Sequence, residues 1–109
     1  MKIAIIGSRT LKIDDFEKYI PEGAEEIVSG GAKGVDLCAR EYATKRGIKL
    51  VEFLPEYEKY KKAAPLKRNL QIIDYADGVI AFWDGKSRGT KFVIDKCREK
   101  SKEIKVIIL

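Results

Sequence analysis

Five short apolar segments alternate with longer segments that carry apolar residues at helical spacing, and this alternation constrains the fold more than any other feature. The segments that predict strands are residues 2–7, 26–29, 49–54, 78–83 and 104–109. Four segments predict helices. The first follows a cap at Asp14 or Asp15, the second covers residues 34–46, the third begins at Pro65 and the fourth begins near Thr90. Residues 55–63 are polar, rich in Tyr and Lys and without a clear period, so they predict a loop.

The apolar positions within each helical segment predict the face that it buries. Helix by helix, these positions are Phe16, Tyr19 and Ile20; Val35, Cys38, Ala39, Tyr42 and Ala43; Leu66, Leu70 and Ile73; and Thr90, Val93, Ile94 and Cys97. Strict alternation of such helices with short apolar strands predicts a parallel sheet covered on both faces. Right-handed crossovers favour the strand order 3-2-1-4-5, so residues 1–109 are expected to form one Rossmann-like, three-layer α/β/α domain.

Composition narrows the chemistry that is open to the chain. Histidine is absent, which removes the commonest general base and the commonest metal ligand, so no metal site and no required cofactor are expected. Cys38 and Cys97 both fall in apolar helical patterns, which favours free buried thiols. No apolar run has the length of a membrane span and the first residues do not form a signal peptide, so we expect a cytoplasmic protein without a membrane partner. The net charge of +5 suits a nucleic acid, an anionic small ligand or simply a lysine-rich surface.

Three glycine-bearing loops follow the strands that the predicted order places next to one another. They are Gly7-Ser8-Arg9, the loop from Ser29 to Asp36 and the loop from Asp84 to Thr90. The carboxyl ends of these strands share one edge of the sheet, where ligands bind in open α/β folds. Unpaired amides at helix N-termini attract anions, and glycine lets a phosphate approach the backbone closely. The loops therefore predict a pocket for a phosphate-bearing ligand, with Lys33, Arg9 and Arg88 as added charge and Ser8, Ser87 and Thr90 as hydroxyl donors.

Each candidate also has a purely structural interpretation. Gly30, Gly31 and Gly34 suit a tight turn with close strand–helix packing as well as they suit a phosphate. For Asp36, stabilisation of a helix N-terminus is the favoured interpretation, and contact with a ligand is the second one. Trp83 is as consistent with packing as with stacking on a base. The loops match neither the Rossmann glycine motif nor the P-loop, which argues against kinases and ordinary NAD dehydrogenases.

Several motifs, in order along nearly the whole chain, resemble those of a known family. They are Ile6-Gly7-Ser8-Arg9, the segment from Ser29 to Asp36, the segment from Ala64 to Asn69, and the segment from Ala76 to Trp83 that leads to Gly89-Thr90. With these motifs the chain resembles the YspA-like branch of the SLOG superfamily of Rossmann-like nucleotide-ligand-binding domains. Its relatives include the cytokinin-activating phosphoribohydrolases and the DNA-processing protein A recombination mediators.

The resemblance implies a ligand derived from nucleotides, such as a nucleoside phosphate or an ADP-ribose-like molecule. It carries over as pocket residues Gly7, Ser8, Arg9, Gly31, Gly34, Asp36, Arg68, Asn69, Gly89 and Thr90. The residues themselves add Gly30, Lys33, Trp83 and Ser87. The resemblance also implies self-association, because relatives often pair through helices.

One departure from the family pattern bears on catalysis. The phosphoribohydrolases carry a catalytic glutamate two residues after the threonine, where this chain has Phe92. Only Asp36 and Asp84 are placed to offer the carboxylate that an oxocarbenium-like transition state needs. The leading hypothesis is therefore binding or sensing of a nucleotide-derived ligand. A nucleotide or NAD-derivative hydrolase is the second hypothesis, and binding of single-stranded nucleic acid ranks last.

Overall fold

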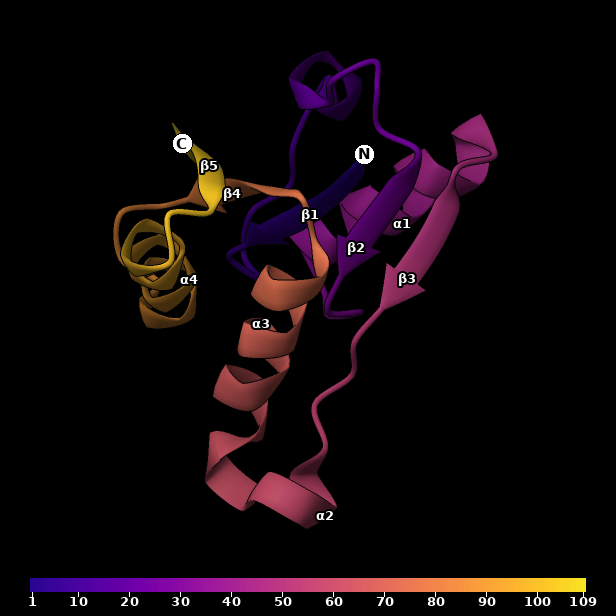
Figure 1. Ribbon diagram of the computed structural model, residues 1–109. Coiled ribbons are helices and arrows are strands. Elements are labelled where there is room, and N and C mark those ends of the chain that lie inside the picture. The colour runs from indigo at the N-terminus through magenta and orange to yellow at the C-terminus, as the bar shows by residue number, and fades with distance from the viewer.

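The computed structural model describes residues 1–109 and contains a five-stranded parallel sheet. The strands are β1 (Lys2–Gly7), β2 (Glu26–Ser29), β3 (Lys49–Glu52), β4 (Gly78–Trp83) and β5 (Glu103–Ile108). Their order is β3-β2-β1-β4-β5, with every neighbouring pair parallel. The predicted three-layer α/β fold and its strand order are confirmed (Figure 1).

The helices lie on both faces of this sheet. They are η1 (Phe16–Tyr19), α1 (Val35–Arg46), α2 (Tyr57–Tyr60), η2 (Lys61–Ala63), α3 (Ala64–Tyr75) and α4 (Arg88–Glu99). Figure 1 shows α3 and α4 in front of the sheet and α1 behind it, with β3 and β5 as its two edges. None of the helices has both the length and the apolar character that crossing a membrane requires.

The core divides into two clusters because successive side chains of a strand point to opposite faces. Ile3 and Ile5 of β1 pack with α1 and η1, whereas Ala4 and Ile6 pack with α3 and α4. On α4 all four positions that the periodicity predicts as buried are buried, and on α1 Cys38 and Tyr42 lie at the margin of the core. Such two-sided burial explains the continuous apolar character of the central strands.

Two local predictions are wrong. The first crossover contains only the short 3-10 helix η1, and Asp15 before it has a left-handed backbone (φ 52°) and no capping hydrogen bond. Residues 55–63, predicted as a loop, contain α2 and η2, neither of which buries a residue. A segment without a buried face has no hydrophobic period, so its helical turns left no signal in the sequence.

The buried face of α3 is also rotated from the predicted one. Leu66 is exposed, while Arg68 and Asn69 are buried beside Ile72 and Ile73. Two polar residues thus occupy positions that a hydrophobic pattern assigns to solvent. Their burial places them at the carboxyl edge of the sheet, where the loops after β1, β2 and β4 meet.

Candidate functional site

A cleft of about 390 Å³ lies where the loops after β1, β2 and β4 converge with the first turns of α3 and α4. Its lining residues are Ile6, Gly7, Ser8, Arg9, Thr10, Gly30, Ala32, Asp36, Pro65, Arg68, Asn69, Ile72, Asp84, Ser87, Gly89 and Thr90. Its volume falls in the range of small-molecule sites, but its lining is mostly polar. Clefts at this edge, where the strand order reverses, are the usual ligand sites of open α/β sheets.

Ten of the fourteen predicted binding residues line this cleft, and four do not. The four are Gly31, Lys33, Gly34 and Trp83. Gly31 and Lys33 line an adjacent hollow of about 320 Å³, which shares Arg9, Gly30, Ala32 and Arg68 with the cleft. The two hollows therefore form one continuous surface over the loop after β2.

Trp83 holds the loop after β4 in place from the end of its strand. Its indole Nε1 donates a hydrogen bond of 3.0 Å to the carbonyl oxygen of Ser87. Asp84 Oδ1 accepts from the amides of Lys86 and Ser87, both at 2.8 Å, and these two hydrogen bonds lower the pKa of its carboxyl. Trp83, a candidate ligand contact, and Asp84, a candidate catalytic carboxylate that lines the cleft, thus both stabilise the turn that leads into α4.

The N-terminus of α4 opens directly onto the cleft. Ser87 is the N-cap, and its Oγ accepts from the amide of Thr90 at 3.4 Å and donates to the Thr90 hydroxyl at 3.3 Å. The amides of Arg88 and Gly89 precede the first intrahelical bonds and have no acceptor in the structure. Gly89 lines the cleft, and a Cβ there would meet no atom within 4 Å. The positive end of the helix dipole thus faces an open polar space.

Ser8 supplies a second donor on the same wall. Its side chain is buried, and its Oγ makes no hydrogen bond of good geometry; the acceptor near it is the Asp84 carboxylate, whose pKa it helps to lower. A buried hydroxyl without a partner costs free energy, about 1–3 kcal/mol by mutational data. Ser8 lines the cleft together with Asp84, Ser87 and Gly89, so an occupant of the cleft would offer its hydroxyl an acceptor besides Asp84.

In the loop after β2, side chains pair with the amides of Gly31 and Ala32 and with the carbonyl of Gly30. Asp36 Oδ2 accepts from the amide of Ala32 at 3.1 Å, and Ser29 Oγ accepts from the amide of Gly31 at 3.4 Å. Arg68 Nη1 donates to the carbonyls of Gly30 (2.8 Å) and Phe53 (3.3 Å). A carboxylate therefore occupies one anion position in this loop, as the Asp84 carboxylate does in the loop after β4.

Three glycines of these loops are required by packing. A Cβ on Gly30 would lie 2.3 Å from Arg68 Nη1, and a Cβ on Gly34 would lie 2.4 Å from the carbonyl oxygen of Arg9. A Cβ on Gly7 would collide with the side chain of Val35, at 2.5 Å from its nearest atom. Gly34 also has a φ of +69°, a conformation that favours glycine. The distances agree with the packing interpretation of Gly30 and Gly34, and also with that of Gly31, where φ is +70° and a Cβ would lie 2.8 Å from a Leu54 methyl carbon.

Asp36 and Arg68 form the buried polar floor of the cleft. Burial raises the pKa of the Asp36 carboxyl, while the Ala32 amide and the charge of Arg68 oppose that rise. Burial likewise lowers the pKa of the Arg68 guanidinium, and Asp36 opposes that fall. Arg68 Nε also donates to Asn69 Oδ1 at 2.9 Å, so Asn69 orients the guanidinium. The segment from Ala64 to Asn69 was predicted to contribute to the pocket, but nothing in the sequence indicated that Arg68 holds the loop after β2.

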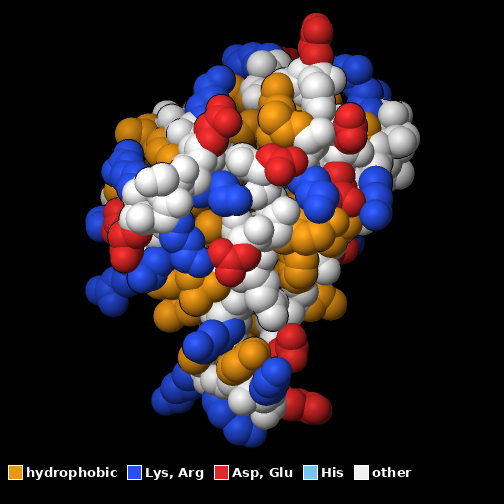
Figure 2. Space-filling model, viewed as in Figure 1, with side chains coloured by type: hydrophobic (Ala, Val, Ile, Leu, Met, Phe, Trp, Pro, Cys, Tyr) orange, Lys and Arg blue, Asp and Glu red, His pale blue; other side chains and the backbone are white.

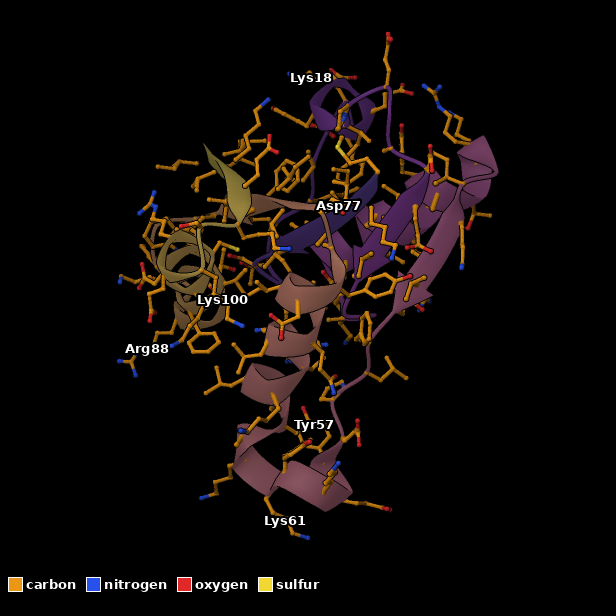
Figure 3. The ribbon with its side chains drawn as sticks, in the orientation of Figure 1. Lys18, Tyr57, Lys61, Asp77, Arg88 and Lys100 are labelled. Carbon is orange, nitrogen blue, oxygen red and sulfur yellow. The ribbon has the colours of Figure 1, made fainter.

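Two further positions that the sequence singled out lie outside the cleft, and some residues that line it were not predicted. Arg88 is exposed and does not line it, and Figure 3 shows its side chain extending away from α4. Phe92, at the position of the glutamate in the phosphoribohydrolases, packs against the core cluster under α3 and α4 and does not line the cleft. Thr10, Ala32 and Pro65 line the cleft without having been predicted. All three stand next to predicted residues or motifs, which was the only signal for them in the sequence.

Comparison with known proteins gives one match. The family model described as "YspA, cpYpsA-related SLOG family" matches residues 1–60. No curated protein and no solved structure matches the chain. The matched part contains the loops after β1 and β2 but not the loop after β4. On this match over more than half of its length, the chain belongs to the YspA and cpYpsA-related SLOG family, and membership indicates a role in binding or processing nucleotide-related ligands.

Proposed function

We propose that the protein binds a nucleotide-derived ligand with its phosphate on the N-terminus of α4. The observation that carries the proposal is the group of unsatisfied donors on one wall of the cleft. The amides of Arg88 and Gly89 and the buried hydroxyl of Ser8 have no hydrogen-bond acceptor in the structure; Ser8 and Gly89 line the cleft, and Arg88 lies between the lining residues Ser87 and Gly89. A phosphate oxygen accepts from such donors and is stabilised by the helix dipole.

The other end of the cleft suits the remainder of a nucleotide. Asp36 lines the cleft, and a carboxylate there accepts hydrogen bonds from sugar hydroxyls, whereas the Asp84 carboxylate at the α4 end is already engaged by the amides of Lys86 and Ser87. The adjacent hollow between Arg9, Lys33 and Leu54 adds room along the same surface. A nucleoside monophosphate or an ADP-ribose-like ligand fits this arrangement, with its phosphate at the donors of α4, its sugar at Asp36 and its remainder in the adjacent hollow.

Calorimetry with AMP, ADP-ribose and NAD tests the proposal, and adenosine serves as the control ligand without phosphate. We expect saturable binding of at least one phosphate-bearing ligand and at least about tenfold weaker binding of its dephosphorylated counterpart, equivalent to about 1.4 kcal/mol. Mass spectrometry of small molecules released from the purified protein identifies a ligand that is already bound. Equal binding of AMP and adenosine would refute the phosphate site, and no binding of any nucleotide at millimolar concentration would refute the function.

A second candidate function, hydrolysis of the glycosidic bond of such a ligand, rests on Asp36. Its buried carboxyl lines the cleft, and burial raises its pKa, as is common for catalytic acids and bases. Incubation with nucleoside monophosphates would then release free base, and Asp36→Asn would abolish release while leaving binding measurable. Absence of release across a nucleotide panel restricts the function to binding.

A further inference from the structure

The two edges of the sheet differ in how they are protected. β3 has four residues, and its two ends carry the ion pairs Lys49–Glu26 and Arg40–Glu52. β5 has six residues in the sequence Glu-Ile-Lys-Val-Ile-Ile, and nothing in the structure pairs with its outer side. A long apolar edge strand is a template for pairing with another chain, and natural proteins usually block such an edge.

The backbone groups on the open side of β5 can be assigned from its pairing with β4. The amide of Leu109 donates to the carbonyl of Trp83 at 3.0 Å, so residues 103, 105 and 107 also direct their backbone groups to β4. In a strand, alternate residues direct their backbone groups to opposite sides. Ile104, Val106 and Ile108 therefore present unpaired amides and carbonyls to the open side.

From this edge we propose that two copies of the chain pair through β5 in antiparallel orientation, centred on Val106. In this register Val106 lies opposite Val106 of the second copy, and Ile104 lies opposite its Ile108. All three outward-facing residues then exchange hydrogen bonds. Lys105 lies opposite Ile107 and Glu103 opposite Leu109, so no like charges face each other. The alternative register centred on Lys105 would place two lysines directly opposite, which is destabilising.

Side-chain exposure supports the second copy as the occupant. Ile108 and Leu109 are 69% and 53% exposed, and both belong to this edge. Pairing covers Ile108 with Ile104 of the other copy on the face that carries α4. Cross-strand pairs of β-branched residues are favourable contacts in antiparallel ladders.

The opposite face offers a matching hollow for Leu109. A hollow of about 330 Å³ lies between η1 and the first residues of β4 and β5, with Tyr19, Ile20 and Ile80 among its mostly apolar lining. Glu103 also lines it, and Glu103 is the residue that the register places opposite Leu109 of the second copy. The short 3-10 helix η1, in place of a full helix, leaves this part of the sheet open. The contact is isologous, because each copy offers Leu109 and receives it.

The test measures the mass of the full chain by sedimentation at high micromolar concentration. We expect twice the 12.3 kDa mass of one chain. Ile108→Lys, at an exposed position, places a charge opposite Ile104 and is expected to give monomers. Leu66→Lys, an exposed apolar residue on α3, is the matched control and is expected to stay dimeric.

A crosslink tests the register separately. In a Cys38→Ser background, Val106→Cys is expected to form an intermolecular disulfide on oxidation, because directly opposed residues have Cα atoms about 5.5 Å apart, within disulfide range. A monomeric wild-type chain, or a dimer that survives Ile108→Lys, would overturn the proposal. A dimer that is lost in Ile108→Lys but does not crosslink through Val106→Cys would overturn the register.

Discussion

The loops after β2 and β4 look alike in the sequence but differ in what they leave unpaired. Both carry glycines, follow a strand at the same sheet edge and lead into a helix of 12 residues. In the loop after β2, Ser29 and Asp36 accept from the amides of Gly31 and Ala32, and Arg68 of α3 holds the carbonyl of Gly30. In the loop after β4, Asp84 accepts from the amides of Lys86 and Ser87, while the amides of Arg88 and of the cleft-lining Gly89 have no acceptor. On the proposed function, the phosphate binds the loop in which side chains leave the helix-terminal amides free.

The largest expected effect is the loss of the clamp on the loop after β2. Arg68→Ala removes hydrogen bonds to Gly30, Phe53 and Asn69 and leaves Asp36 without its nearby positive charge. We expect the free energy of unfolding to fall by about 3 kcal/mol. Chemical denaturation measures it, and a loss under about 1 kcal/mol would show that the loop does not depend on this residue.

The next largest effect is a difference in stability between alanine variants of a glycine from each loop. Gly34→Ala introduces a Cβ 2.4 Å from the Arg9 carbonyl at a φ of +69°, so we expect a loss of about 2–3 kcal/mol. Gly89→Ala is the matched variant. It lies in the first turn of α4 with open space around its Cβ, so its stability is expected to change by less than about 1 kcal/mol. Equal losses in the two variants would contradict the comparison.

Ser8→Ala is expected to change stability and binding in opposite directions. Removing a buried hydroxyl that has no partner is expected to stabilise the unliganded protein by about 1 kcal/mol. The same change removes a donor to the phosphate and is expected to weaken AMP binding about tenfold, or 1.4 kcal/mol. Denaturation and calorimetry on one preparation measure both. A variant that is less stable and binds normally would show that Ser8 serves the fold.

The smallest effect is a pH dependence that belongs to Asp36. Because burial raises its pKa in the folded state, the native protein holds this proton more tightly than the unfolded chain. Asp36 therefore makes the free energy of unfolding decrease as the pH rises from its ordinary value of 3.8 through the raised one. Relative to wild type, Asp36→Asn should become progressively more stable across that interval. A difference that is independent of pH would contradict the raised pKa.

The sequence predicted the strands and helices because the spacing of apolar residues differs between the two. It predicted the strand order because five alternating parallel strands with right-handed crossovers allow few topologies. It predicted the position of the cleft because parallel strands bring their carboxyl ends together. It did not reveal how the loop after β2 is held, since Arg68, which holds its Gly30 carbonyl, lies far along the chain. Arg68 reaches Gly30 across 38 residues, and no local pattern indicates that contact.

The helical turns of residues 57–63 were missed for a different reason. They form a protrusion at the end of α3 on which lysines gather, seen at the bottom of Figure 2, and Tyr57 and Lys61 lie on it in Figure 3. Its residues bury no face, so neither a strand nor a helix period was present to detect.

Titration of the ¹⁵N-labelled chain with AMP, followed by amide NMR, tests the phosphate site most directly. The account predicts that the amides of Arg88 and Gly89 shift saturably with ligand, with the largest changes on the α4 side of the cleft. The amides of Gly31 and Ala32, which Ser29 and Asp36 already engage, should shift far less. Large saturable shifts at Gly31 and Ala32, with Arg88 and Gly89 unmoved, would place the phosphate on the loop after β2 and contradict the account.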